Sequence, residues 1–409
     1  MFSSREGVTM DSVLRPLRQW LLAPSTTIPV AVALSLPTIV PAIIDRLSPD
    51  ALVSIASSPL FSRFLDTLVD LSGRKSPFQK PACIIAAVAV ALAANDYVVS
   101  KTANNWVEDR SWDWEKEIVL ITGGSSGIGA SVAQRFISKN PLTRVVIVDS
   151  SPLTWTPPPD SLVHYYECDI TDSDAIKDVG DRVRQDVGHP TVLFNNAGIS
   201  RSGGVLESEH DSAVIQTNLT AQILMTKEFL QEMVIQDHGH IVFTGSFSSI
   251  IPMPRLASYS AAKAGLMAFH QALQMELKYF YNAPRVRQTL GIFSFVKTPM
   301  ADFGKARGSF VLPFLDVESV SERLVDGVYS TRSSNIYMPG LVSFVTALRG
   351  GPEWLFRPFL TMGAKGSRRL LEKQNSKEDG RFPGAKTYFE AERERAALRK
   401  QRIEAKAKE

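Results

Sequence analysis

Short apolar runs alternate with longer amphipathic stretches through the middle of the chain. Several brief, β-branched runs have the character of buried strands: 117–121, 145–148, 191–194, 241–243 and 289–293. Stretches such as 130–138 and 210–236 instead place apolar residues at helical spacing. Strands that alternate with helices predict an α/β fold, in which a Rossmann-like, doubly wound parallel sheet carries helices on both faces.

Two uncharged apolar stretches precede this region. Pro29, Pro37 and Pro41 interrupt the first, 19–44, and the second, 81–95, is shorter than the roughly twenty residues that a straight membrane-spanning helix needs. Neither is therefore predicted to be a clean transmembrane helix. A soluble helical cap on the core is one interpretation of these stretches, and a membrane hairpin or a monotopic insertion is the favoured one.

The chain is also apolar after the last predicted strand. Residues 298–316 combine bulky apolar groups with Gly304 and Gly308, which is typical of a mobile lid over a substrate cleft, although a helix pair packed on the core has the same composition. Residues 341–362 mix aromatic groups with arginines, as helices at a membrane surface do. From residue 365 the chain is charged, which indicates a solvated helix or a disordered tail.

The chain therefore divides into four predicted parts. An apolar, helical, membrane-associating region (1–112) precedes the α/β domain (113–340), and an apolar and aromatic membrane-surface segment (341–364) and a charged helical or disordered tail (365–409) follow it. With 409 residues, the chain is well over the length of one such domain, so both extensions call for a role of their own.

Composition excludes several classes of function. A formal net charge of +3, with no aromatic-and-basic motif, does not indicate nucleic-acid binding. The two cysteines, Cys83 and Cys168, indicate no disulfide framework and suit a reducing compartment. His238 and His240 are the one close histidine pair, and no metal site is predicted there. Acidic Glu6 precedes the first apolar stretch and no small-residue cleavage site is evident, which argues against a cleavable signal peptide.

A glycine-rich turn follows the first predicted strand. The sequence Thr-Gly-Gly-Ser-Ser-Gly-Ile-Gly occupies positions 122–129, directly before a helix. Glycines let the backbone approach a pyrophosphate closely, and the N–H groups and dipole at a helix N-terminus attract its charge. We predict that the turn binds a dinucleotide through Gly123, Ser125, Ser126, Gly127, Ile128 and Gly129.

The second strand ends at Asp149, about twenty residues after the glycine turn, where a carboxylate can accept hydrogen bonds from an adenosine ribose. This position favours NAD, because Asp149 would repel a 2′-phosphate and neither Ser150 nor Ser151 offers it a positive charge. NADP is not excluded. An aspartate that only caps a turn at the strand end is the alternative interpretation.

Three side chains with complementary chemistry lie farther along the chain. Tyr259 and Lys263 are one helical turn apart, and Ser246 stands thirteen positions before Tyr259, just after a predicted strand. A tyrosine hydroxyl titrates near pH 10 and becomes a useful base at neutral pH only when a nearby cation stabilises the phenolate. Lys263 is placed to supply that cation, and Ser246 to hold a substrate oxygen, which indicates alcohol and ketone chemistry.

These elements together resemble the short-chain dehydrogenase/reductase family. The resemblance covers residues 115–340: the T-G-x-x-x-G-x-G turn, the acidic strand end, an Asn-Asn-Ala-Gly element at 195–198 and the Ser, Tyr and Lys set occur in family order. It implies that Asn218 is a fourth catalytic residue, which holds a water in a proton relay from Lys263, and that Tyr259 and Lys263 also contact the cofactor. Further implied cofactor contacts are Asp169, Ile170, Asn196, Ala197, Gly198, Val296 and Thr298.

The resemblance leaves two questions open, one at Asp169 and one in the loop that leads to Val296 and Thr298. Asp169 resembles the family's adenine-contacting acidic residue, but it could equally be the start signal for the helix that begins near Asp172. After the strand at 289–293, the family usually has Pro-Gly, whereas this chain has Ser294-Phe295 before Val296. The path of the loop that leads to Val296 and Thr298 is therefore not predicted by the resemblance.

The apolar extensions are similar to those of the membrane-associated branch that contains retinol and hydroxysteroid dehydrogenases. This similarity implies a lipophilic alcohol or ketone as substrate, a membrane or lipid-droplet surface as partner, and a location at the endoplasmic reticulum or a lipid droplet with the catalytic domain facing the cytosol. The family also allows a homodimer. Two other functions remain as alternatives: an NADP-dependent ketoreductase of a biosynthetic pathway, and a catalytically idle scaffold on a membrane or lipid droplet.

Overall fold

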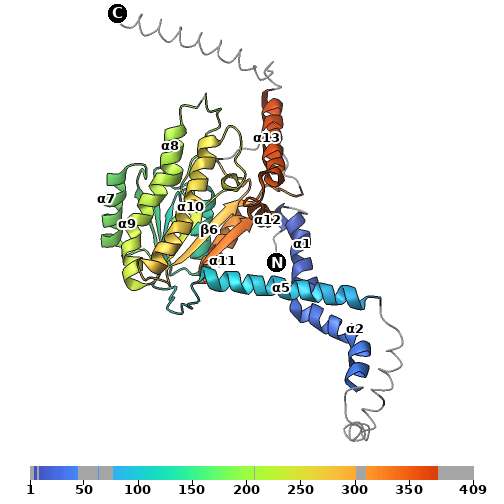
Figure 1. Cartoon of the computed structure of the whole chain (residues 1–409). Coiled ribbons are helices and arrows are strands. Elements are labelled where there is room, and N and C mark those ends of the chain that lie inside the picture. Colours follow the sequence, from blue (N-terminus) through green and yellow to red (C-terminus); the bar gives the residue numbers. More distant parts are fainter. Residues whose placement is uncertain are drawn as a thin grey trace, which may run out of the picture.

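The computed structural model describes residues 4–6, 9–44, 63, 77–206, 208–300 and 310–375. Its centre is a seven-stranded, all-parallel sheet in the order β3-β2-β1-β4-β5-β6-β7, which confirms the predicted fold class (Figure 1). The strands are β1 (Ile118–Thr122), β2 (Arg144–Asp149), β3 (Val163–Glu167), β4 (Val192–Asn195), β5 (His240–Thr244), β6 (Arg287–Phe293) and β7 (Ser334–Met338).

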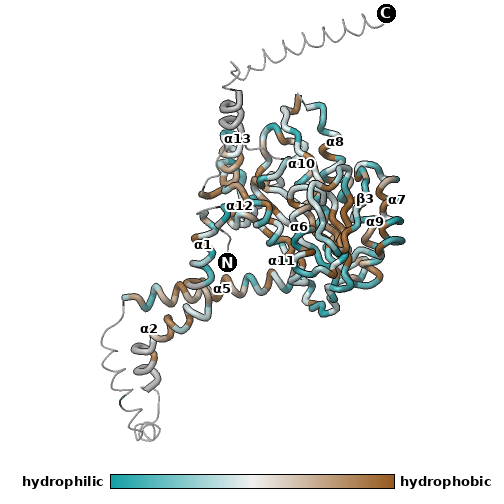
Figure 2. The backbone as a smooth tube through the Cα atoms, turned by 180° about the vertical axis from the view of Figure 1, so that it is seen from behind, coloured by the Kyte–Doolittle hydropathy of each residue, from teal (hydrophilic) through white to brown (hydrophobic). Residues whose placement is uncertain are grey.

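Helices cover both faces of the sheet. On one face lie α7 (Ser173–Asp186), α8 (Asp211–Ile215), α9 (Ala221–Gln236) and α10 (Ala257–Tyr279), and on the other α6 (Gly127–Lys139) and α11 (Val317–Tyr329) (Figures 1 and 2). In β1, Leu120 belongs to the core under α7, α9 and α10, while Val119 and Ile121 pack in the core under α6 and α11. Because successive side chains of a strand point to opposite faces, a wholly apolar strand serves both layers.

The strand order reverses between β1 and β4, since the chain first adds strands on one side of β1 and then on the other. In open α/β sheets, the crevice outside the carboxyl ends of the strands at such a reversal is where ligands bind. The glycine turn after β1 and the Asn-Asn-Ala-Gly element after β4 both lie at this position.

The N-terminal region forms helices that project away from the sheet: α1 (Met10–Leu21), α2 (Pro24–Ile44) and α5 (Gln79–Ala103) (Figure 1). In α2 and α5, the Ser35 hydroxyl lies 3.5 Å from the Cys83 sulfur, and Arg18 at the end of α1 pairs with Asp96 of α5 at 2.5 Å. Apolar colouring follows much of α2 and α5 outside the core (Figure 2).

The length of α5 corrects the prediction that the second apolar stretch is too short. The helix continues past Asn95 to Ala103 and has 25 residues, and it is long and apolar enough to cross a membrane by length and composition. A straight span needs about twenty residues, so α5 exceeds that requirement. Among the described helices it is the one that meets this test.

The end of α5 is fixed to the sheet. Asn104 bonds with the main chain of Ser333 before β7, and the Gln274 side chain of α10 donates to the Ala103 carbonyl at 3.1 Å. The buried Arg287 guanidinium of β6 donates to the carbonyl oxygens of Asn104 and Val107. The apolar helices and the α/β domain are therefore joined by several buried hydrogen bonds.

Two helices follow β7: α12 (Leu341–Leu348) and α13 (Glu353–Asn375). Val342, Val345 and Phe356 are buried in the same core as Ile250 and Ile251, so these helices dock on the domain. Phe344 and Trp354 remain exposed at 59% and 75%. The predicted helix pair is present, and its last turns extend into the segment that was expected to be tail; residues 376–409 lie outside the described part.

The predicted lid is described only at its two ends. Phe303, Gly304 and Gly308 lie outside the described residues. At the far end, the main-chain nitrogen of Met10 donates to the Phe310 carbonyl at 2.9 Å. In the same region Glu6 accepts from the Asp316 nitrogen at 3.3 Å, and Asp11 accepts from the Gly340 nitrogen at 2.7 Å. Glu6 and Met10 thus contact the C-terminal end of the predicted lid segment, 298–316.

Candidate active site

A cavity of about 810 Å³ opens at the carboxyl ends of the strands, at the reversal of strand order. It brings together residues from every part of the predicted site. Those that line it are Gly123, Ser126, Gly127, Ile128, Asp149, Asp169, Ile170, Asn196, Ala197, Gly198, Asn218, Ser246, Tyr259, Lys263, Val296 and Thr298. Ser125 and Gly129, which were also predicted to contact a cofactor, do not line it.

The glycine turn has the geometry of a phosphate cradle. Gly123 and Gly127 have φ values of +68° and +56°, a region that residues with a Cβ rarely adopt. A Cβ at Gly123 would stand 2.8 Å from the Cα of Ala197, so the turn and the β4 end come into close contact. Helix α6 begins at Gly127 and directs its N-terminus at the cavity wall. These features fit the diphosphate of a dinucleotide.

Packing requires a glycine at position 129. A Cβ there would lie 2.2 Å from the Gly123 oxygen and 2.7 Å from the Asn196 Nδ2, so only glycine lets the first turn of α6 close against the strand end. Ser125 is 1% exposed, and its hydroxyl donates to the Ser151 carbonyl at 2.6 Å. Direct contact of these two residues with a cofactor stays a prediction.

The loop after β2 folds back over the glycine turn. Trp155 donates through its ring nitrogen to the Gly124 carbonyl at 3.1 Å, and Thr154 donates through its hydroxyl to the Ser125 carbonyl at 2.6 Å. The loop covers the outer side of the turn and leaves the inner side open to the cavity.

Asp149 both caps this turn and lines the cavity. Its Oδ2 accepts from the Ser125 nitrogen and its Oδ1 from the Ser151 nitrogen, each at 3.0 Å. The turn-capping interpretation is therefore present in the structure. A carboxylate has about four lone-pair sites, so two such bonds leave acceptor capacity for a ribose.

Asp169 does not start the next helix. Its Oδ1 accepts from the nitrogen and the hydroxyl of Thr171 at 2.9 and 2.8 Å, and it lines the cavity. The N-cap of α7 is Asp172, whose carboxylate accepts from the nitrogens of Asp174 and Ala175. The two aspartates therefore have separate structural positions.

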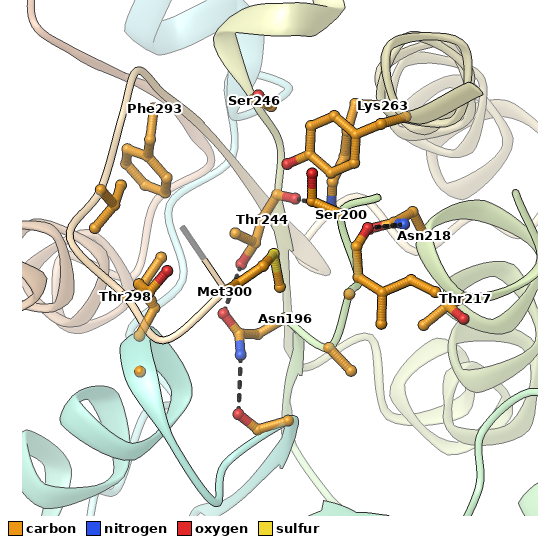
Figure 3. Close-up of a pocket in the computed structure, with 18 of the residues that line it drawn as sticks. Asn196, Ser200, Thr217, Asn218, Thr244, Ser246, Lys263, Phe293, Thr298 and Met300 are labelled. Atoms are coloured by element: carbon orange, nitrogen blue, oxygen red, sulfur yellow. Dashed lines mark hydrogen bonds between the residues drawn. The ribbon is translucent and has the colours of Figure 1, made fainter. Parts of the chain in front are cut away.

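The Asn-Asn-Ala-Gly element ties three strands together. Asn196 donates to the carbonyl oxygens of Thr122 and Gly123 and accepts from the Thr244 hydroxyl at 3.3 Å (Figure 3). The hydroxyl of Thr122 accepts in turn from the nitrogens of Asn196 and Ala197. These bonds hold the ends of β1, β4 and β5 at the cavity floor.

Asn218 lies in one turn of π-helix, Gln216–Thr220, between α8 and α9. Such turns are often found at functional sites. Its Nδ2 donates to the carbonyl oxygens of Ile199 and Val214, and its buried Oδ1 has no hydrogen-bond partner among the described residues. An acceptor in that state fits the water expected at this position. Asn218 and Lys263 lie on the same wall (Figure 3).

The catalytic candidates converge at the centre of the cavity. Both Tyr259 and Lys263 project from α10, and the Lys263 ammonium lies 5.8 Å from the centre of the Tyr259 ring and donates to the Thr244 carbonyl at 2.8 Å. Burial lowers the pKa of Lys263 to about 8. Burial raises the pKa of Tyr259, and its hydrogen bond with Ser246 acts in the opposite direction. In the protein alone, burial therefore outweighs the predicted lowering of the tyrosine pKa.

The loop without Pro-Gly has a defined path. Val296 forms a parallel bridge with Leu315, and the Leu315 nitrogen donates to the Phe295 carbonyl at 2.8 Å. Leu315, at the C-terminal end of the predicted lid segment, therefore supports the loop that carries Val296 and Thr298 to the cavity.

The cavity also contains Ser200, Ser202, Ser248 and Arg255, which were not predicted, and Met300, which belongs to the predicted lid segment 298–316. They come from loops after β4, β5 and β6, whose paths follow from tertiary packing. Nearness to Ser246 and Tyr259 in the sequence was the one available signal, and it applied to Ser248 and Arg255.

The histidine pair lies elsewhere. His238 contacts Glu117 at 3.2 Å and Ser111 at 3.0 Å, and the ring of His240 faces the Thr289 hydroxyl at 2.8 Å. No group of three potential metal ligands occurs in the described ranges.

Comparisons with known proteins agree with this geometry. The sequence model described as short chain dehydrogenase matches residues 117–304. Dehydrogenase RED2 of Cochliobolus heterostrophus is 37% identical over 206 residues, which cover 50% of this chain and 77% of that protein. The chain belongs to the short-chain dehydrogenase family. It is therefore an NAD(P)-dependent oxidoreductase.

A retinol dehydrogenase and an estradiol dehydrogenase are among the similar proteins, in agreement with the branch that the sequence resembles. Epidermal retinol dehydrogenase 2 of Mus musculus is 28% identical over 243 residues, 57% of this chain and 77% of that protein. Estradiol 17-beta-dehydrogenase 11 of Rattus norvegicus is 29% identical over 240 residues, 57% of this chain and 78% of that protein. A short-chain dehydrogenase from Burkholderia cenocepacia, solved with NADP, has the same fold at a TM-score of 0.51 and 20% identity, covering 61% of this chain and 99% of that one.

Proposed function

We propose that this protein interconverts a lipophilic alcohol and its ketone or aldehyde, with Tyr259, Lys263, Ser246 and Asn218 as the catalytic residues. The observation that carries the proposal is the convergence of these four side chains in one cavity with the glycine turn. The tyrosine is half-buried beside the buried lysine on a rigid helix, which suits proton transfer at the cavity.

In the oxidative direction, the Tyr259 phenolate accepts the hydroxyl proton of the substrate. Ser246 donates a hydrogen bond to the substrate oxygen, and the Lys263 ammonium favours the charged form of the tyrosine. Asn218 holds a water that passes the proton onward from Lys263. A nicotinamide held beside Val296 and Thr298 would supply the acceptor for the hydride of the carbinol carbon. In reduction, Tyr259 acts as the acid.

We infer a preference for NAD. Asp149 lines the cavity at the end of β2, where its negative charge opposes a 2′-phosphate. Gly123, Ser126, Gly127 and Ile128 would hold the diphosphate, with Asp169, Ile170, Asn196, Ala197 and Gly198 beside the adenosine and the riboses, and Val296 and Thr298 beside the nicotinamide amide. The last two positions are supported by the loop that Leu315 holds in place.

We further propose that the protein works at the membrane of the endoplasmic reticulum or at a lipid-droplet surface, with the catalytic domain facing the cytosol. Ile84, Ile85, Val88 and Val90 of α5 are exposed on a helix that is long enough to cross a membrane. Two relatives are named for retinol and estradiol, which supports a lipophilic substrate. In this proposal residues 1–112 and 341–364 attach the domain 113–340 to the surface, and 365–409 is a polar tail.

The catalytic proposal is tested with a Tyr259→Phe variant on a panel of hydrophobic alcohols, followed by nicotinamide absorbance. We expect kcat to fall at least about 100-fold, because the proton acceptor is removed. Tyr281→Phe is the matched control, since Tyr281 is exposed and bonds to Glu276 on the surface. No turnover by the wild-type protein on the whole panel would leave the idle scaffold as the better interpretation. Equal, measurable turnover by the wild-type protein and the Tyr259→Phe variant would show that Tyr259 is not the proton acceptor.

The cofactor proposal is tested by fluorescence titration with NADH and NADPH. We expect NADH to bind the wild-type protein more tightly, and Asp149→Asn to reduce the difference, because that change removes the repelling charge. Tighter binding of NADPH by the wild-type protein would instead favour a ketoreductase.

The membrane proposal is tested by carbonate extraction of cell membranes. The wild-type protein is expected in the membrane pellet, and the double variant Ile85→Asp/Val88→Asp in the soluble fraction, because two charges on α5 are costly in hydrocarbon. Val205→Asp is the control, since Val205 is 74% exposed on the α/β domain. Complete recovery of the wild-type protein in the soluble fraction contradicts the proposal.

A further inference from the structure

The oxygen of Ser246 accepts two hydrogen bonds from a single neighbour. The main-chain nitrogen of Ser248 donates to the Ser246 Oγ at 3.2 Å, and the Ser248 hydroxyl donates to the same atom at 2.9 Å. Ser248 is 3% exposed and lines the cavity. Both residues belong to the turn that follows β5, where Ser246 is the N-cap of a short 3-10 helix, η3 (Phe247–Ser249).

These two bonds determine where the proton of Ser246 can point. A hydroxyl has one donor and two acceptor lone pairs, and here both lone pairs are engaged by Ser248. Apart from these two lone pairs and its bond to Cβ, the Ser246 Oγ carries only its own O–H bond. That bond is directed away from Ser248, toward the tyrosine and the space where the substrate oxygen would lie.

We propose that Ser248 is a positioning residue: it holds the Ser246 hydroxyl as a hydrogen-bond donor to the reacting oxygen. The inference rests on the proposed function, because it assigns Ser248 a part in the same proton chemistry. Two donors on one oxygen also polarise its O–H bond, so Ser246 becomes a stronger donor to the alkoxide-like oxygen that develops during the reaction.

The Ser248 hydroxyl is not needed to hold the turn. The main chain supplies that support: the nitrogens of Ile250 and Ile251 both donate to the Phe247 carbonyl at 2.9 Å. The neighbouring Ser249 reinforces it, since its nitrogen and its hydroxyl donate to the Ser246 carbonyl at 3.0 and 2.6 Å. The two adjacent serines thus differ in target: Ser249 bonds to the main chain of Ser246, and Ser248 to its reacting side chain.

This difference supplies a matched experiment. Ser248→Ala, Ser248→Thr and Ser249→Ala are compared with the wild-type protein in steady-state oxidation of one alcohol from the substrate panel, together with NADH affinity and thermal unfolding. We expect Ser248→Ala to lower kcat about three- to tenfold, with KM and NADH affinity changed less than about twofold, because one hydrogen bond of two is lost and only the reacting state depends on it. Ser248→Thr should restore most of the rate, because it returns the hydroxyl.

The pH profile separates positioning from a structural defect. When Ser246 donates to Tyr259, it stabilises the phenolate and lowers the pKa of the tyrosine. In Ser248→Ala the Ser246 hydroxyl keeps only the bond from the main-chain nitrogen, so it is less firmly oriented and loses part of this effect. The rise of kcat/KM with pH should therefore move to higher pH. Ser249→Ala should leave the profile in place.

The outcomes are distinct. Wild-type kinetics in Ser248→Ala, or an equal loss in Ser249→Ala with no shift of the profile, would overturn the inference and leave the proposed function intact. Full turnover by Tyr259→Phe would overturn the proposed function and this inference with it. If Ser248→Ala unfolds, its melting curve shows it. Ser248→Thr then tests the inference, because it must keep at least about half of the wild-type kcat.

Discussion

The side chain of Asn104 exchanges two hydrogen bonds with the main chain of Ser333. Its Nδ2 donates to the Ser333 carbonyl at 3.3 Å, and its Oδ1 accepts from the Ser333 nitrogen at 2.8 Å. Asn104 directly follows the apolar helix α5, and Ser333 directly precedes β7. Because both residues are buried, this exchange satisfies main-chain groups that water cannot reach.

Replacing Asn104 with alanine is therefore expected to lower the free energy of unfolding by about 1–3 kcal/mol, since two buried main-chain groups lose their partner. Thermal unfolding in a mild detergent measures the change. Asn95→Ala is the control, because Asn95 is an exposed asparagine on the same helix. An Asn104→Ala protein as stable as the control would show that the joint does not depend on this pair.

Gly129→Ala should weaken both folding and cofactor binding. The new Cβ would meet the Gly123 oxygen and the Asn196 side chain, so the turn must shift. We expect a loss of about 1–3 kcal/mol in stability and at least about tenfold in NADH affinity. Gly350→Ala is the comparison, because nothing lies within 4 Å of its added carbon. Unchanged NADH affinity in Gly129→Ala would contradict the role given to the turn.

Lys263→Met is expected to abolish turnover while it raises the melting temperature at pH 7. Burial lowers the folded-state pKa of Lys263 to about 8, whereas the lysine titrates near 10.5 when unfolded. Below pH 8 both states bind the proton, and the fold bears the full cost of burying it. Between 8 and 10.5 the unfolded state binds more protons, so the stability of the wild-type protein increases with pH in that range.

The melting-temperature advantage of Lys263→Met should therefore be largest below pH 8 and shrink toward pH 10. Unfolding curves across this range check the sign, and nicotinamide absorbance checks for at least about a 100-fold loss of kcat. An advantage that grows with pH would mean that the charge of Lys263 stabilises the fold.

His238 predicts a pH dependence of the opposite sign. Its hydrogen bond with Glu117, helped by Asp109, raises the pKa of the histidine. The resulting stabilisation is complete below the unfolded pKa of about 6.5 and is lost as pH rises through the higher folded value. His238→Gln should therefore melt a few degrees below the wild-type protein at pH 6, with a smaller difference at pH 9. A difference independent of pH would assign the effect to packing against Trp112.

Local patterns predicted the sheet and most of the cavity because both depend on short-range rules. The strands are runs of apolar residues, and Tyr259 and Lys263 share a helix whose period brings them together. The end of α5 was missed for a long-range reason: Asn95 and Asp96 interrupt the apolar pattern, but Asp96 is neutralised by Arg18 of another helix. A pairing between residues so far apart leaves no mark in the local sequence.

The same distinction explains which features of the site local patterns did not predict. Ser125 belongs to a glycine turn that predicts contact with a cofactor, yet its hydroxyl bonds to Ser151 of the following loop. That loop returns because Thr154 and Trp155 donate to the carbonyl oxygens of the turn. Loop paths of this kind depend on many weak contacts at once, so Ser248 and Arg255 could not be assigned to the cavity from residue type alone.

The contacts of Glu6, Met10 and Asp11 bear on how the enzyme is produced. A shortened version that starts after α5, made to avoid detergent, would also lose the groups that hold Phe310, Asp316 and Gly340. Assays on such a fragment would report on a protein that lacks these contacts close to Leu315, which bonds to the loop that carries Val296. Kinetic constants for bulky alcohols should therefore be measured on a protein that retains residues 1–112.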